Sequence, residues 1–551
     1  MSLVIGLAWE RNVAVFVASA PLPENMWFEG IPPFVMAFLI GGVILLIIMV
    51  GYSILSAAIP RSGGGYVAIS RVITPFAGFL AAWFEFLSIS WVFGSIAGSV
   101  VFNVLYVSGP MTLTVPLGTY SDIALFLGGL LLIVVFSALS AFGLKWQGYV
   151  LQILFWIPAV LTLYVVYLLS IAVASPAVLE RGISAWAQLQ GVPGVTADTY
   201  VKAALAQGLD ASRVADYWTA VSVSLLGAYF AYGGYAATTF VVGEVKEPTK
   251  NLPRVLIIAS IVVIIMYVTV AHIATYAAAS VGQTTLPNGD KWSFLEAYSF
   301  LSWSGSLAQA GVPPLTFRLQ TVPEMVGLAL GFGNLNILIF LFAVLWIVND
   351  FPAFILTSSR ILFAMSFDRV LPASLSKVNR FHSPVNAVIL VGTFAVLGLL
   401  GAGGSCVVCT GGSWSLGGPL GVALNAIFVD GVYSTDLLDV VFFSLFSLAV
   451  LLLPFRQRRL FDRAYFKPGG KLGVAVVGLA GVIANIVIGW EVLVSPGDSY
   501  NILAPNSDNW YALGFTVFLG VIGCLIYAYY RLGPSGRKVD YLAIFSEIPP
   551  D

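Results

Sequence analysis

The chain has 551 residues, of which 59% are hydrophobic and only 9% charged, and its mean hydropathy is +0.95. Soluble proteins carry roughly 25% charged residues, so this composition excludes a soluble globular domain and indicates a polytopic membrane protein. The formal net charge of −1 gives no sign of nucleic-acid binding.

Apolar runs long enough to cross a bilayer as a helix recur along the whole chain. They lack the strict two-residue alternation of barrel strands. We therefore predict an all-α integral membrane protein with about 12 transmembrane helices. The predicted spans cover residues 3–20, 32–59, 76–106, 122–143, 148–174, 217–243, 254–279, 335–366, 385–402, 437–455, 472–494 and 511–530.

The basic residues define an orientation for these spans. With the N-terminus inside, 19 of the 25 Lys and Arg fall in the predicted inner loops and tail, and 5 fall in the outer loops. Such an excess is typical of cytoplasmic loops. The N-terminus lacks the basic region and cleavage site of a signal peptide. We expect a multi-pass protein of the cell (plasma) membrane with both termini in the cytoplasm.

The first predicted span carries an acid, a base and an amide in succession, Glu10, Arg11 and Asn12. Such groups are costly in hydrocarbon unless they meet partners or water. Two interpretations fit. In one, this span is a discontinuous helix, with Trp9 and Asn12 at a binding site. In the other, it is a short amphipathic segment at the membrane surface.

A tight inner turn follows the second span, because Pro60 stops the helix and residues 63–65 are glycines. The stretch Pro60-Arg61-Ser62-Gly63-Gly64-Gly65-Tyr66, followed by Gly78-Phe79 and Trp83, resembles a signature of the amino acid–polyamine–organocation (APC) superfamily. Residues 243–254, 358–372 and 453–461 resemble later motifs of that superfamily. The tail, residues 544–550, resembles that of archaeal members.

The resemblance implies a five-plus-five inverted repeat, the leucine-transporter-like fold, with two peripheral helices. It also implies that spans 1 and 6 are broken at mid-membrane and hold the substrate there. The implied division of the chain is a first repeat at 1–174, an extracellular loop at 175–216, a second repeat at 217–455 that includes outer loops 280–334 and 403–436, and two peripheral spans with a cytoplasmic tail at 456–551.

The sixth span has its own sign of a break, because Gly233 and Gly234 are adjacent near its middle. Each Gly costs a helix interior about 1 kcal/mol relative to Ala. Interrupted spans are pointers to transporter substrate sites, although paired small residues also allow close helix packing. By the resemblance, the substrate-binding residues here are Phe230, Ala231, Tyr232, Gly233 and Gly234, with Phe230 as an aromatic gate.

The chain also departs from the superfamily pattern. The first span has no glycine run, since only Gly6 precedes Trp9. Many relatives place an acid where this chain has Ala236, and some proton-coupled relatives place a Lys in span 5, near Pro158 here. The usual proton-coupling groups are therefore missing.

Ionisable residues inside a membrane are functional hypotheses by default. Asp350, beside Asn349, lies 15 residues into the span that starts at residue 335. It could bind a coupling cation, relay a proton or accept a cationic substrate group; alternatively it is a protonated carboxyl bonded to a neighbouring helix. For Glu85 in span 3, we expect a place at an inner gate beside Arg61 or Arg71; alternatively it too is a protonated carboxyl bonded to a neighbouring helix.

The cytoplasmic gate is assigned to Arg61, Arg71 and Glu244. The large outer loops are Gly/Pro-rich and are interpreted as extracellular caps without chemistry. One of them holds Cys406 and Cys409, where a short disulfide fits better than a zinc pair, since nearby His or Cys partners are missing. No function is expected of either cysteine.

The sequence thus predicts a secondary active transporter, not an enzyme, that moves an amino acid or related amine by alternating access. No cofactor is expected, and the coupling ion is H⁺ or Na⁺. The expected partners are a small-molecule substrate and membrane lipid, without nucleic acid, for a monomer or homodimer. Two alternatives stay open: a non-transporting amino-acid sensor or scaffold on the same fold, and an exchanger of polyamines or cationic amino acids.

Overall fold

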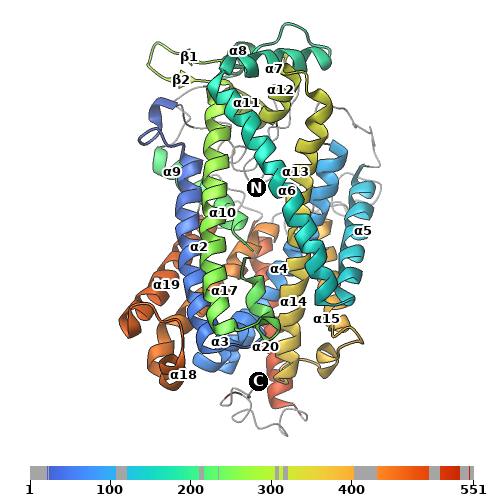
Figure 1. The fold of residues 1–551 in the computed structure, drawn as a ribbon, viewed down its shortest axis with the longest axis vertical. Helices are drawn as coiled ribbons and strands as arrows, with labels where there is room; N and C mark the ends of the chain where they lie inside the picture. The colour runs from blue at the N-terminus through green and yellow to red at the C-terminus, as the bar shows by residue number, and fades with distance from the viewer. Residues whose placement is uncertain are drawn as a thin grey trace.

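The computed structural model describes residues 22, 24–106, 121–209, 216–233, 235–303, 310–313, 321–401, 431–494, 509–533 and 545. These residues form an elongated bundle of helices with one two-stranded hairpin at its upper end (Figure 1). The longest helices are α2 (Pro33–Ala58), α4 (Pro75–Tyr106), α5 (Ser121–Ala141), α6 (Leu144–Ala174), α10 (Pro248–Ala279), α17 (Gly431–Arg456), α19 (Gly470–Val494) and α20 (Asn509–Leu532).

Two membrane-length segments are divided into shorter pieces. One is α9 (Tyr217–Ala231) followed by the 3₁₀ helix η4 (Tyr235–Glu244), and the other is α13 (Asn336–Val348) followed by α14 (Asp350–Phe367). The remaining elements of the bundle and its lower end are α3 (Gly64–Val72), η6 (Gly333–Leu335), η7 (Ala373–Ser376), α15 (Val385–Leu400) and α18 (Arg458–Arg463).

The described residues include nine helices long and apolar enough to cross a membrane, and two shorter apolar ones, α9 and α15. Each coincides within several residues with a predicted span. The predicted first span, residues 3–20, lies outside the described residues. The structure therefore confirms an all-α membrane protein.

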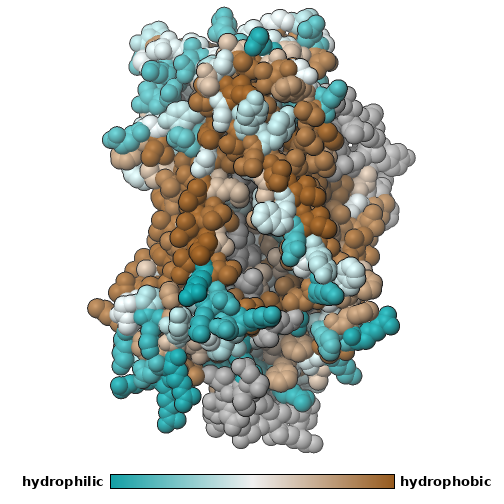
Figure 2. Space-filling model, viewed as in Figure 1, coloured by the Kyte–Doolittle hydropathy of each residue, from teal (hydrophilic) through white to brown (hydrophobic). Residues whose placement is uncertain are grey.

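The outer surface fits a bilayer. Large apolar side chains point away from the bundle, such as Leu163 on α6, Leu472 on α19 and Leu525 on α20, which are 71%, 77% and 64% exposed. Figure 2 shows this apolar surface around the middle of the molecule, with hydrophilic residues gathered at the two ends. Apolar surface of this extent is stable only against lipid.

Helix α4 lies at the centre of the bundle, in contact with α3, α5, α13, α14, α15, α17 and α20. Of its most apolar stretch of 18 residues, 78% is buried inside the protein. Close packing against α15 depends on two glycines. A Cβ at Gly94 would lie 1.6 Å from the Ala395 carbonyl oxygen, and one at Gly398 would lie 1.9 Å from the Trp91 carbonyl oxygen. Small residues at helix crossings allow backbones to approach in this way.

The described parts of the predicted outer loops contain short helices and a hairpin. They carry η1 (Glu24–Met26), α7 (Pro176–Leu189), α8 (Ala197–Ala206), β1 (Thr284–Thr285), β2 (Lys291–Trp292), α11 (Phe294–Trp303) and α12 (Thr321–Ala329). Helix α7 packs on α12 and α8 packs on α11, so these elements form a layer over the upper end of the bundle (Figure 1). Their helices are short and amphipathic, which is why a search for long apolar runs misses them.

Candidate functional site

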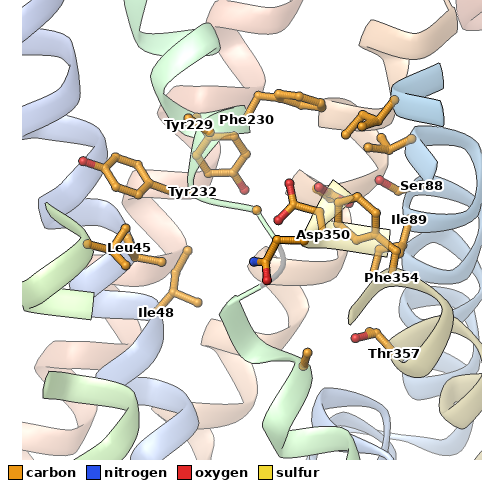
Figure 3. Close-up of a pocket in the computed structure, with 18 of the residues that line it drawn as sticks. Leu45, Ile48, Ser88, Ile89, Tyr229, Phe230, Tyr232, Asp350, Phe354 and Thr357 are labelled. Atoms are coloured by element: carbon orange, nitrogen blue, oxygen red, sulfur yellow. The ribbon is translucent and has the colours of Figure 1, made fainter. Parts of the chain in front are cut away.

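A cavity of about 360 Å³ lies inside the bundle, where α2, α4, α9, α10, α13, α14 and α17 meet. Figure 3 shows part of its lining, with Asp350 between Tyr232 on one side and Ser88 on the other. Most of the described lining is aliphatic or aromatic. The polar side chains among it are Glu85, Ser88, Tyr229, Tyr232, Tyr267, Asn349, Asp350, Thr357 and Asp439.

The cavity lies at the point where α9 stops. The last turn tightens, because the N–H of Tyr232 bonds the Tyr229 carbonyl at 3.0 Å and that of Gly233 bonds the Phe230 carbonyl at 3.1 Å. The Tyr267 hydroxyl of α10 donates to the Ala231 carbonyl at 3.2 Å, which satisfies one of the orphan acceptors at a helix C-terminus. A new helix, η4, starts at Tyr235. The predicted break in span 6 is therefore confirmed.

Four of the five residues predicted around this break line the cavity: Phe230, Ala231, Tyr232 and Gly233. The Tyr232 ring stacks on Tyr267, with centroids 5.2 Å apart, and its hydroxyl donates to the Phe38 carbonyl at 3.0 Å. Gly234 lies outside the described residues, as do Trp9 and Asn12 of the first span and the pair Cys406 and Cys409.

Asp350 reaches the cavity at a local irregularity in a span that stays helical. Helix α13 ends at Val348 and α14 begins at Asp350, but Asn349 between them keeps helical φ and ψ angles of −58° and −25°, and residues Gly333–Phe367 form one membrane-length helical segment. Pro352 explains the irregularity, because it has no N–H to donate to the Val348 carbonyl. Asn349 has a buried side-chain oxygen without a hydrogen-bond partner among the described residues.

Glu85 of α4 faces Asp439 of α17, and their side chains are hydrogen-bonded to each other. Ser88 interacts with the same Asp439 carboxyl. The prediction that Glu85 pairs with Arg61 or Arg71 is wrong, because Glu85 lines the cavity whereas Arg71 bonds Asp368.

The sequence analysis missed Asp439. In the predicted span 437–455 it falls in the first turn, where an acid is typical of a helix end at the membrane surface. Helix α17 instead begins at Gly431, so Asp439 lies inside the bundle. Asp436, one turn earlier, is buried, and we find no signal in the sequence that marks either acid as lying inside the bundle.

All the charged side chains in the described cavity lining are acidic. Three carboxyl groups, those of Glu85, Asp350 and Asp439, line the cavity, and no Lys, Arg or His does so within the part of the chain that the structure describes. A low-dielectric site with this composition attracts cations or protons.

The lower end of the bundle carries a fully paired charge. Arg71 of α3 donates from Nη1 to Asp368 Oδ2 at 2.6 Å and from Nη2 to Oδ1 at 2.9 Å, and the Tyr66 hydroxyl donates to Oδ2 at 2.8 Å. Burial lowers the pKa of Arg71, but its hydrogen bonds and attraction to Asp368 raise that pKa above its usual value. The Phe545 ring lies over the guanidinium, with 4.8 Å between the guanidinium carbon and the ring centroid.

The turn before α3 depends on its glycines. Gly63 and Gly64 have φ angles of 109° and 51°, in the region that L side chains rarely adopt. The N–H of Gly63 bonds the Phe240 carbonyl of η4 at 3.3 Å. Arg61 lies half-buried in this same turn. The structure thus brings Arg61 and Arg71 to one end of the bundle; Glu244 ends η4, and its side chain lies outside the described part.

Comparison with known proteins gives a consistent result. A family model described as "Amino acid permease" matches residues 1–524. The large neutral amino acids transporter small subunit 2 of Oryctolagus cuniculus is 23% identical over 377 residues, which are 68% of this chain and 58% of that protein. The Asc-type amino acid transporter 1 of Mus musculus is 22% identical over 395 residues, 70% of this chain and 61% of that protein.

The aligned part thus spans less than two thirds of the length of these curated relatives. Among solved structures, MhsT in complex with L-phenylalanine is 15% identical, with a TM-score of 0.46, over 89% of this chain and 98% of that chain.

Proposed function

Because this chain belongs to the amino acid permease family, we propose that it is a secondary active transporter that moves an amino acid or related amine across the cell membrane. The observation that carries the proposal is the cavity at the end of α9, lined by carboxyl groups and aromatic rings. Its volume of about 360 Å³ is at the small end of the range for ligand pockets, which suits one small organic molecule.

The substrate's ammonium group binds near the end of α9. The C-terminus of a helix carries about half a negative charge, and Ala231, Tyr232 and Gly233 form that end. Phe230 supplies an aromatic face over the substrate. In this proposal the substrate's carboxylate binds the first span near Trp9 and Asn12, with Gly234 completing the α9 side.

In this proposal the carboxyl groups of the cavity bind the coupling ion. Asp350 and Glu85, with the Asn349 amide, offer oxygen ligands to H⁺ or Na⁺. These residues lie on α4 and at the junction of α13 and α14, so binding there acts on elements that line the substrate cavity. The transporter needs no further cofactor, and works in lipid as a monomer or homodimer.

The Arg71–Asp368 pair belongs to a gate at the cytoplasmic end, together with Arg61 and Glu244. The excess of Lys and Arg in the predicted inner loops supports this orientation, as does the position of α3 and α18 at the same end of the bundle (Figure 1). In alternating access this gate is closed when the cavity opens outward and breaks when it opens inward.

A second candidate is an exchanger of polyamines or cationic amino acids. The observation that favours it is the presence of three carboxyl groups and no basic side chain in the described cavity lining. A substrate with an additional ammonium group would find a counter-ion there.

The deciding experiment is uptake of radiolabelled L-alanine, L-leucine, L-arginine and putrescine into proteoliposomes, with a pH gradient, a Na⁺ gradient, or neither. Uptake that needs a gradient identifies a symporter, and uptake only into substrate-loaded vesicles identifies an exchanger. If nothing is taken up although an amino acid raises the melting temperature by binding the folded protein, the protein is a sensor and the proposal is wrong.

Gly233→Val tests the assignment of the α9 end. A Cβ at Gly233 would lie 3.3 Å from the Phe230 carbonyl oxygen, and the two valine methyls extend further into the cavity. We expect uptake to be lost while membrane insertion is retained, with Gly233→Ala less affected; Gly234→Val carries the same expectation. Gly514→Val is the control, since a Cβ there on α20 meets nothing within 4 Å. Normal uptake by Gly233→Val would remove this end of α9 from the substrate site.

A further inference from the structure

We propose that Glu85 and Asp439 form a proton-binding site that couples substrate movement to a pH gradient. This inference rests on the proposed transport function and assigns its coupling ion. The pair joins α4 to α17 on the wall of the cavity. Glu85 is only 5% exposed.

A proton must be present for the observed contact to exist. The two carboxyl groups are hydrogen-bonded to each other, and an ionised carboxylate only accepts hydrogen bonds. One of the two groups therefore carries a hydrogen that it donates to the other. Two carboxyl groups in hydrogen-bond contact in a low-dielectric site cannot both ionise without strong repulsion, so in the proposed site the pair holds at least one proton in this conformation.

The surroundings offer further unused hydrogen-bonding capacity. The Tyr52 hydroxyl of α2 is buried, at 2% exposure, and has no partner among the described residues, although Tyr52 interacts electrostatically with both carboxyl groups. Glu85 Oε2 and Asp439 Oδ1 also lack partners in this part of the chain. A buried polar group left unpaired is costly, so three such atoms around one acid pair indicate a site that takes a ligand during its working cycle.

No basic group in the described structure neutralises the pair. The ionisable groups that face it are Tyr52 of α2 and Tyr229 of α9, while Asp436 of α17 acts on Tyr229 and Asp350 of α14 lies elsewhere on the cavity wall. Ser88 adds a hydroxyl beside Asp439. Every ionised neighbour is therefore acidic, and each favours retention of a proton.

The direct contact favours a proton over a metal cation. A metal ion between the two carboxyl groups would have to separate them and replace their mutual hydrogen bond with bonds to itself. A proton fits the observed geometry without any displacement. The proton-loaded pair thus ties α4 to α17 as they are packed here.

Loss of that proton would leave adjacent carboxylates that repel each other across the α4–α17 contact. The conformation described here is therefore favoured by the protonated pair, and other packings of these helices are favoured by the ionised pair. A ligand that binds one conformation better shifts the population toward it. Because the same helices line the substrate cavity, proton binding and substrate binding act on one equilibrium.

The test compares Glu85→Gln and Asp439→Asn with the wild type in proteoliposomes. Each amide can still donate a hydrogen bond to the remaining carboxylate, so both variants are expected to fold and to keep the α4–α17 contact. The control is Asp462→Asn, the same chemical change on exposed α18, where Asp462 pairs with Arg458 at 3.6 Å. The substrate is whichever of L-alanine, L-leucine, L-arginine and putrescine the wild type carries.

Three measurements are made on each protein. The first is the steady-state substrate distribution at a gradient of one pH unit, with the membrane potential clamped at zero. The others are counterflow at equal pH and the acidity of the vesicle lumen, reported by a trapped pH-sensitive dye. With one proton per substrate, the wild type and Asp462→Asn should reach up to about tenfold asymmetry. Glu85→Gln and Asp439→Asn should show none and move no protons, while keeping counterflow.

Other outcomes overturn the inference. These are a wild type that transports but ignores the pH gradient or responds only to Na⁺, and variants that keep the wild-type response to pH. Loss of counterflow in both variants would place the two acids in substrate binding instead. In all of these cases the proposed transport function survives. Absence of any transport by the wild type would reject both this inference and the proposed transport function.

Discussion

Two groups of acids in this molecule have opposite surroundings. At the lower end, Asp368 receives two hydrogen bonds from Arg71 and one from Tyr66. Around the cavity, Glu85, Asp350 and Asp439 have no basic partner among the described lining residues. In the first arrangement the carboxylate is fully paired, and the contact holds α3 against the end of α14. In the second arrangement the carboxyl groups lack a cationic partner, so they can still bind a ligand, whereas the paired carboxyl group of Asp368 cannot.

The difference shows why a buried charge alone does not identify a binding site. Bidentate Arg–carboxylate pairs are specific and strong, and such a pair is suited to a gate that is either closed or open. Intramembrane carboxyl groups without a cation are candidates for ligand binding. The predictions below test this contrast, from the largest expected effect to the smallest.

Arg71→Ala should destabilise the protein most. It leaves Asp368 and Tyr66 buried without their cation, and breaking a buried pair costs about 3–5 kcal/mol. The measurement is thermal and denaturant unfolding in detergent. Arg458→Ala is the control, because its partner Asp462 and Arg458 itself are 56% and 72% exposed and such pairs contribute little. Equal effects of the two substitutions would remove the distinction between the lower end and the protein surface.

Glu296, in the outer layer, shows what an acid without a cation does to stability. Burial raises the pKa of Glu296 from 4.5 to about 7, although hydrogen bonds from Ser293 lower it in part. Between these two pH values the folded protein binds more protons than the unfolded chain, so stability should fall as pH rises through that window. The loss is about 3 kcal/mol, at about 1.4 kcal/mol for each unit of pKa.

Melting temperatures measured from pH 4.5 to pH 8 test this expectation. Glu296→Gln keeps the capping interaction at the start of α11, because Gln serves there as Glu does, and it should remove this part of the pH dependence. An unchanged pH profile in that variant would mean that other groups cause the dependence.

For the second candidate, an exchanger of cationic substrates, Asp350→Asn should weaken binding of the substrate's additional ammonium group. Hydrogen bonds to charged groups contribute about 1.5–3 kcal/mol, which corresponds to a roughly ten- to hundredfold rise in Kd. Calorimetric titration of the purified protein measures it. Thr357→Val, on the same helix and the same cavity wall, changes shape little and charge not at all. Equal binding by both variants would mean that Asp350 does not contact the substrate.

Phe545→Ala should have the smallest effect. The ring lies over Arg71 and is only 9% exposed, and such contacts contribute about 0.5–2 kcal/mol, more when they are desolvated. Phe381→Ala is the matched control, because Arg380 lies 4.7 Å from the centroid of a ring that is 37% exposed. Unfolding measurements should show a larger loss for Phe545→Ala, and the reverse order would mean that the tail residue does not support the Arg71 pair.

Much of the architecture could be predicted without a structure. Long apolar runs define α2, α4, α6, α10 and α19, because a helix of that composition is stable only in lipid. The adjacent glycines at 233 and 234 predicted the end of α9, since Gly weakens a helix wherever it occurs. The glycines after Pro60 predicted the turn into α3. All of these are local properties of the chain, and neighbouring residues are enough to express them.

The pairing of charges was decided only by the tertiary structure. Arg71 and Asp368 lie 297 positions apart, and Glu85 meets Asp439 from a helix whose start the hydropathy pattern places too late. Which acid meets which base depends on how α3, α4, α14 and α17 pack, and close packing depends in turn on contacts such as those of Gly94 and Gly398. Hydrophobicity specifies that a helix enters the membrane, but it is non-directional. The partners of a buried carboxyl group are therefore chosen by packing.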